Sequence, residues 1–137
     1  MGEAHAGRLL DHVHLRVVDL AVSRRFYEAV LGVVGIPLRA HETAFSADEL
    51  YVSADGPPTQ GLHLAFQTPD RETVHRFFEA ALAAGGRDNG GPGERSYHPG
   101  YYAAYVLDPD GNNVEAVYHG PFERSAPSVV FTWEDPA

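Results

Sequence analysis

Three residues at separate places in the chain have the side chains best suited to chemistry. His12 begins one alternating segment, His63 begins another, and Glu115 lies in an apolar segment with Val114 and Ala116. Burying a carboxylate there is costly unless a positive group meets it. Two imidazoles and one carboxylate form a ligand set that leaves open positions on a divalent ion such as Fe, Mn, Ni or Zn. Taken singly, each residue has a structural alternative: solvated or packed histidines and an edge-strand glutamate facing water.

An internal repeat relates the two histidines. Seven residues recur without a gap at a constant spacing of 51 positions. The matched pairs are His12/His63, Asp19/Asp70, Arg25/Arg76, Phe26/Phe77, Glu28/Glu79, Leu31/Leu82 and Gly35/Gly86. Most of these positions suit a helix cap, an apolar stripe or a helix end, but a core strand needs no histidine at its start. The repeat predicts two copies of one module and singles out its two histidines.

The first copy predicts a strand, a helix and three short strands. Residues 12–19 alternate between polar and apolar, as in a half-buried strand, and Asp19 is expected to cap a helix. The apolar stripe of that helix comprises Val22, Phe26, Tyr27, Val30 and Leu31, followed by Gly32 and Gly35. Further short strands are expected within 36–40, 43–46 and 49–53, before a turn-rich linker at 54–61.

The second copy repeats this order. A strand is predicted at 61–67, and Thr68 is expected as the helix N-cap with Pro69 in the first turn. The predicted stripe of the helix comprises Val74, Phe77, Phe78, Ala81 and Leu82. A loop is expected at 87–98, and a hairpin is expected around the turn 108–111, where Pro and Gly favour a tight reversal. A short strand is expected at 128–133, within the extension 120–137.

Composition excludes several classes of function. The chain has 137 residues, of which 44% are hydrophobic and 21% charged, as in ordinary globular domains. A formal net charge of −9 argues against a nucleic-acid partner. The chain has no cysteine, which excludes a thiolate site. No apolar run approaches the roughly 20 residues of a membrane span, so no membrane partner is expected and a cytoplasmic location is the default.

These elements predict an α+β fold in which two βαβββ modules form a half-barrel around a concave trough. Alternation along the strands directs His12, His14 and Arg16 to the trough if the apolar residues between them meet the helix. By the same logic His63 faces the trough, and Glu115 converges on it.

The doubled module resembles the vicinal oxygen chelate superfamily, which includes glyoxalase I, extradiol dioxygenases, fosfomycin-resistance enzymes and bleomycin-resistance proteins. The resemblance rests on segments 10–20, 61–66 and 108–115. It covers one domain at 9–119, with module one at 9–56 and module two at 61–119. It implies a homodimer, and metal ligands at His12, His63 and Glu115.

Two branches of the superfamily differ in what they imply here. Glyoxalase I has a fourth ligand on the last strand of its first half. The matching residue here is Tyr51, although a register slip would place Glu49 there. The extradiol dioxygenase pattern is matched by His98, Tyr105, Asp108, Pro109, Gly111 and Glu115. It implies that Tyr105 lies near the substrate oxygens and that His98 is an acid/base beyond the metal ligands.

The resulting hypothesis is a metal-dependent dioxygenase or glyoxalase-like lyase that chelates adjacent oxygens of a small substrate. Substrate contacts are expected from four residues, namely His14, Arg16, Tyr51 and Tyr101. The alternative is a metal-free small-molecule binding protein of the bleomycin-resistance type. The substrate, the ion and the reaction are left open.

Overall fold

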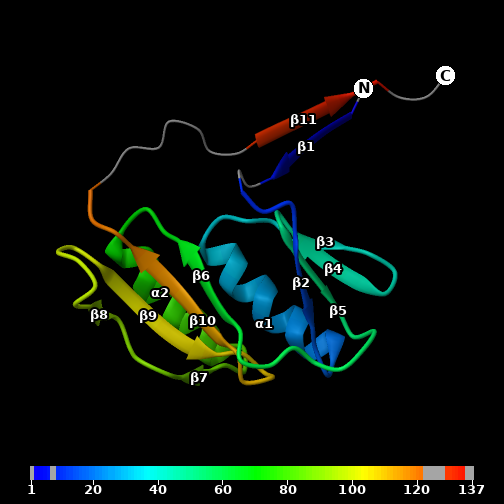
Figure 1. The fold of residues 1–137 in the computed structure, drawn as a ribbon. Helices are drawn as coiled ribbons and strands as arrows, with labels where there is room; N and C mark the ends of the chain where they lie inside the picture. The colour runs from blue at the N-terminus through cyan, green and yellow to red at the C-terminus, as the bar shows by residue number, and fades with distance from the viewer. Residues whose placement is uncertain (1, 7–8, 122–128, 135–137) are drawn as a thin grey trace.

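The computed structural model describes residues 2–6, 9–121 and 129–134, and it confirms the predicted mixed α+β fold. Besides a two-stranded terminal ribbon, Figure 1 shows two larger sheets, with the helices packed against them. Module one comprises β2 (Val13–Arg16), α1 (Leu20–Val33), β3 (Arg39–Ala40), β4 (Ala44–Ala47) and β5 (Leu50–Ser53). Its strands are arranged in the order β2-β5-β4-β3.

Module two has the same plan. It comprises β6 (His63–Gln67), α2 (Arg71–Ala83), β7 (Arg87–Asp88), β8 (Gly93–Glu94), β9 (Tyr102–Leu107) and β10 (Asn113–Tyr118). The strand order is β6-β10-β9-β7, and β8 also pairs with β9, so two short strands lie where the sequence predicts a loop. In both modules the first strand runs parallel to the last strand and forms an edge of its sheet.

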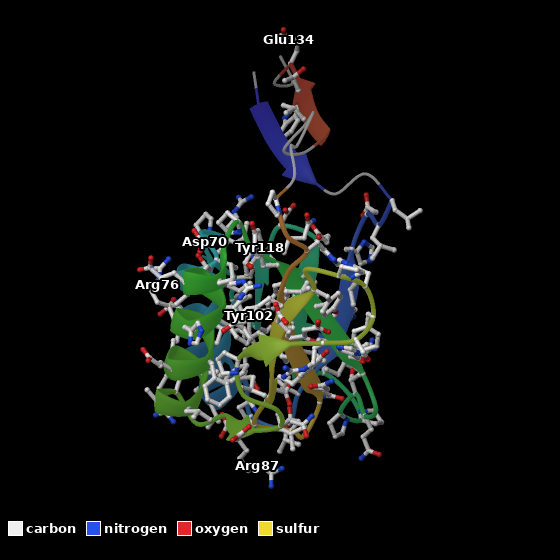
Figure 2. The ribbon with its side chains drawn as sticks, turned by 90° about the vertical axis from the view of Figure 1, so that its left-hand side faces the viewer. Asp70, Arg76, Arg87, Tyr102, Tyr118 and Glu134 are labelled. Carbon is white, nitrogen blue, oxygen red and sulfur yellow. The ribbon has the colours of Figure 1, made fainter. Side chains whose placement is uncertain are left out.

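Both helices begin at an aspartate of the repeat. The carboxylate of Asp19 accepts a hydrogen bond from the backbone N–H of Val22 at 3.2 Å, and that of Asp70 accepts one from Thr73 at 2.7 Å. Figure 2 shows Asp70 where α2 starts. The prediction of Asp19 is confirmed and that of Thr68 is wrong. The buried Thr68 hydroxyl instead donates to the carbonyl of Val117 in β10.

The modules share one core, in which matched repeat positions differ. Leu31 of α1 is 3% exposed, whereas Leu82 of α2 is 40% exposed. Within the predicted apolar stripe of α2, Val74, Phe77 and Ala81 are buried as expected, whereas the inclusion of Leu82 is wrong.

The hairpin turn of module two is tied to module one. The Asp108 carboxylate accepts hydrogen bonds from the backbone N–H groups of Asp110 and Asn112, both at 2.9 Å. Gly111 has a φ of 89°, which closes the predicted turn. The other oxygen of Asp108 accepts the Tyr27 hydroxyl of α1 at 2.6 Å. The turn therefore fixes α1 against β9 and β10.

A two-stranded ribbon joins the two ends of the described chain. The strand β1 (Gly2–Ala6) pairs antiparallel with β11 (Val129–Trp133). The predicted strand at 128–133 corresponds to β11, except that Ser128 lies outside the described residues. Figure 1 shows this ribbon apart from the two sheets. In the described part of the chain, neither helix is long and apolar enough to span a membrane.

Candidate functional site

Glu115 is the centre of a polar cluster on the open face of the second sheet. It lies in the apolar strand β10 and is 1% exposed. Its Oε1 atom is 2.7 Å from Nε2 of His63, and its Oε2 atom accepts a hydrogen bond from the Tyr101 hydroxyl. Two donors therefore offset the cost of burying this carboxylate, as the sequence argument requires.

His63 connects the buried carboxylate to the surface. Its side chain is 52% exposed, in contrast to Glu115. Because a carboxylate only accepts hydrogen bonds, Nε2 of His63 carries the proton that joins them. The same two atoms are donor types that divalent transition metals use. The pair can thus hold a proton between its two groups or act as two ligands of an ion.

Two tyrosines surround Glu115 with phenol groups. Burial raises the pKa of Tyr101, and the hydrogen bond and charge of Glu115 raise it further. Tyr105 lies directly opposite Glu115 in the β9–β10 ladder. Burial also raises the pKa of Tyr105. The Tyr97 hydroxyl and the charge of Glu115 raise it further. Both phenols consequently remain protonated donors at neutral pH.

His98 is paired with a histidine that the sequence interpretation missed. Its Nδ1 lies 2.9 Å from the carbonyl oxygen of Pro99, and its Nε2 lies 2.9 Å from Nδ1 of His119. A carbonyl only accepts, so Nδ1 of His98 carries a proton. Both imidazoles meet the ring of Tyr101 edge-on. The hairpin register would have revealed this partner, since Tyr118 faces Tyr102 and the next residue therefore approaches Tyr101.

His12 does not join His63 and Glu115. It precedes β2, its side chain is 66% exposed, and its Nδ1 atom is 2.7 Å from a carboxylate oxygen of Asp11. Among residues 2–6, 9–121 and 129–134, no three His, Cys, Asp or Glu side chains are grouped closely enough to hold a metal ion. The structure therefore brings together two of the three predicted ligands within one chain.

The predicted substrate contacts of module one lie on a second polar surface. Nε2 of His14 is 2.7 Å from the Ser53 hydroxyl, which donates to Asp55 at 2.8 Å. Arg16 also donates to Asp55, at 3.0 Å. The hydrogen bond from Ser53 and then that from Arg16 lower the pKa of Asp55. Ser53 and Asp55 were absent from the sequence prediction because no repeat or motif marks them.

Tyr51 occupies the position in module one that Glu115 has in module two. Tyr51 faces His14 in the β2–β5 ladder, just as Glu115 faces Ala65 in the β6–β10 ladder. The repeat spacing maps Ala65 onto His14. The register therefore puts a phenol ring at the position of the fourth glyoxalase I ligand, and Glu49 is not shifted into it. The ring of Tyr51 lies 5.0 Å from that of His14.

The comparisons with known proteins agree with this architecture. The sequence model of the Glyoxalase/Bleomycin resistance protein/Dioxygenase superfamily matches residues 9–116. Because the match spans well over half of the chain, the protein belongs to this superfamily.

Individual relatives show how far the similarity extends. A solved glyoxalase/bleomycin resistance protein from Albidiferax ferrireducens is 34% identical with a TM-score of 0.72, covering 80% of this chain and 98% of that one. Virulence protein STM3117 of Salmonella typhimurium is 29% identical over 120 residues, which are 77% of this chain and 81% of that protein. A glyoxalase-related enzyme from Fulvimarina pelagi, 20% identical with a TM-score of 0.67, covers 91% of this chain and 98% of that one and shows the shared fold alone.

Proposed function

We propose that the chain binds a small oxygen-bearing molecule at the cluster of Glu115, His63 and Tyr101, and acts on it as a metal-dependent enzyme. The observation that carries this proposal is the burial of Glu115 in an apolar strand beside a half-exposed imidazole 2.7 Å away. A carboxylate without function would be expected at the water-facing end of the strand. Glu115 is instead buried inside the protein, and the neighbouring His63 is half-exposed to solvent.

The described residues of one chain do not complete a site for a transition-metal ion. Catalytic sites of this kind use three protein ligands, and His63 and Glu115 are two. Our proposal therefore includes a homodimer in which His12 of a second copy approaches the pair. His12 is exposed, and its contact among the described residues is with its neighbour Asp11, which leaves it accessible to a second copy. The ion, when bound, supplies Lewis acidity toward adjacent substrate oxygens.

The chain's own residues have separate roles in this proposal. Tyr101 fixes the orientation of Glu115 through its hydrogen bond. Tyr105, whose raised pKa keeps it protonated, donates to a substrate oxygen on the same face of the sheet. His98 accepts and returns a proton near Tyr101. The surface of His14, Arg16 and Tyr51 contacts the rest of the substrate, and the reaction is a ring cleavage or a lyase step.

A second candidate function is metal-free binding of a small molecule. One observation favours it: both oxygens of Glu115 are hydrogen-bonded to side chains of the same chain, His63 and Tyr101. A carboxylate satisfied in this way has no need of an ion. In this alternative the cluster recognises a polar group of the ligand and performs no chemistry on it.

Metal content separates the two functions. Untagged protein is dialysed against Fe(II), Mn, Ni or Zn and its bound metal is measured, with His41→Ala as a control variant. Enzyme function predicts about one ion per chain, lost in His63→Ala and kept in the control. An ion-free protein under all four conditions supports the metal-free alternative. Incubation of the Fe(II) form with catechols and O2 then tests ring cleavage directly.

A further inference from the structure

A cavity of about 390 Å³ lies between the two modules, apart from the proposed site. Neither His63 nor Glu115 lines it. Its walls are the free edge of β6, the C-terminal end of α1 and the turn between β4 and β5. The volume falls within the range of roughly 300 to 1,000 Å³ typical of small-molecule pockets.

The walls are mainly apolar, with carboxylates on one side. Leu31, Val34 and Ile36 from α1 and its end face Leu64 and Phe66 of β6. The polar side chains among the described lining residues are Asp48, Glu49 and Gln67, and these described walls include no arginine or histidine. The described walls thus offer an apolar ligand a negative group.

Glu49 is incompletely bonded. Its Oε2 atom is buried and has no hydrogen-bond partner among the residues that the structure describes. Burial raises the pKa of this carboxyl group, and the neighbouring Asp48 raises it further. Asp48 itself has a φ of 51°, in the left-handed region that few non-glycine residues adopt. The turn holds the two acidic residues beside each other, and a cationic ligand would offset the cost of burying the Glu49 oxygen.

We propose that this cavity binds a small organic cation whose apolar body fills the space between α1 and β6 and whose protonated amine pairs with Glu49. An ammonium group fits better than Ca²⁺ or Mg²⁺, because those ions take six or more oxygen ligands and the walls are largely hydrocarbon. The proposal is independent of metal binding at His63 and Glu115.

The test uses three probes of similar shape on the full chain: 2-phenylethylammonium, the neutral 2-phenylethanol and the anionic 3-phenylpropanoate. Binding is followed by calorimetry and by the backbone amide signals of Leu64 and Phe66. We expect saturable binding of the ammonium, at least about tenfold weaker binding of the alcohol, and none of the carboxylate. Equal binding of the ammonium and the alcohol, or no saturable binding of the ammonium, would overturn the proposal.

Two variants locate the site. Glu49→Gln should weaken ammonium binding about tenfold or more, whereas Glu42→Gln, an exposed acid outside the cavity, should leave it unchanged. Leu10→Trp places a larger side chain at a half-exposed wall position and should block all probes while Glu49 is retained. Unchanged ammonium affinity in Glu49→Gln would exclude the assigned contact, and circular dichroism confirms that each variant is folded.

Discussion

The two modules repeat one scaffold but place the same histidine in different chemical surroundings. His63 contacts the buried Glu115, whereas His12 contacts its exposed neighbour Asp11. The residue that matches Glu115 in module one is Tyr51, which is 37% exposed. The two last strands therefore differ at the position whose carboxylate contacts the histidine in module two.

The turns before the last strand, between β9 and β10 and between β4 and β5, also differ in the surroundings of an acidic residue. In module two, Asp108 is buried and accepts hydrogen bonds from Asp110, Asn112 and Tyr27. In module one, one oxygen of the half-buried Glu49 is buried and has no partner among the described residues. We therefore expect the acid to stabilise the turn of module two and to destabilise that of module one, which the following substitutions can test.

The largest effect is expected from Asp108→Ala. The substitution leaves two backbone N–H groups and the Tyr27 hydroxyl without their acceptor inside the protein. We expect a loss of about 3 to 5 kcal/mol in the free energy of unfolding, measured by urea denaturation. Tyr27→Phe is the partial control and should cost less, because it removes only one of the three hydrogen bonds. A loss below about 1 kcal/mol in Asp108→Ala would mean that the turn does not join the modules.

The matched leucines of the two helices give the next largest effect. Leu31→Ala removes a side chain that is 3% exposed and should cost about 2 to 4 kcal/mol. Leu82→Ala removes its counterpart, which is 40% exposed, and should cost under about 1 kcal/mol. Urea denaturation of both variants measures the difference. Equal losses would show that the repeat, rather than the packing described above, determines burial.

Much of this fold follows from local rules, and the exceptions have physical causes. The repeat predicts both helices, and Asp19 and Asp70 recur because each helix needs an acceptor at its first turn. The prediction that Thr68 caps α2 failed for a physical reason. Its sequence position suits a cap, but its hydroxyl donates to the carbonyl of Val117, 49 residues away in β10. Burial of Leu82 could not be judged either, since it depends on how the modules pack together.

Local rules also predict part of the candidate site. Alternation and the hairpin place His63, Tyr105 and Glu115 on one face of one sheet, and the structure brings these residues together. The position of His12 depends on how the two sheets are arranged, and the local sequence carries no signal of that arrangement. The hydrogen bonds of Ser53 and Asp55 likewise depend on neighbours from another strand.

The helix caps should differ in strength and in pH dependence. Asp70 bonds both the backbone and the hydroxyl of Thr73, which lowers its pKa, whereas Asp19 bonds one backbone N–H. Asp19→Ala should cost about 1 kcal/mol, and Asp70→Ala should lower the melting temperature more. Because the folded pKa of Asp70 is lowered, its contribution is present above the ordinary aspartate value and lost as pH falls through the folded value. The gap between wild type and Asp70→Ala should therefore close in acid, and a pH-independent gap would contradict this.

The smallest effect is expected from Glu49→Gln, and it has the opposite sign. The folded pKa of Glu49 is raised, so its ionisation disfavours folding as pH rises above the ordinary glutamate value. The variant should therefore melt at a higher temperature than wild type at pH 7, and the two should converge at lower pH. Thermal unfolding at several pH values measures this, with Glu42→Gln as the control. A lower melting temperature at pH 7 would show that Glu49 has a stabilising partner.

The composition of the proposed site is tested most directly by metal binding to mixed subunits. His12→Ala and His63→Ala are purified separately, unfolded and refolded together, and their bound metal is counted. The account predicts that neither variant binds metal alone and that the mixture regains about one quarter of the wild-type content, since half of the dimers carry one intact site of two. A mixture as empty as its components, or full metal binding by His12→Ala alone, would contradict a site built from His12 of one copy and the His63–Glu115 pair of the other.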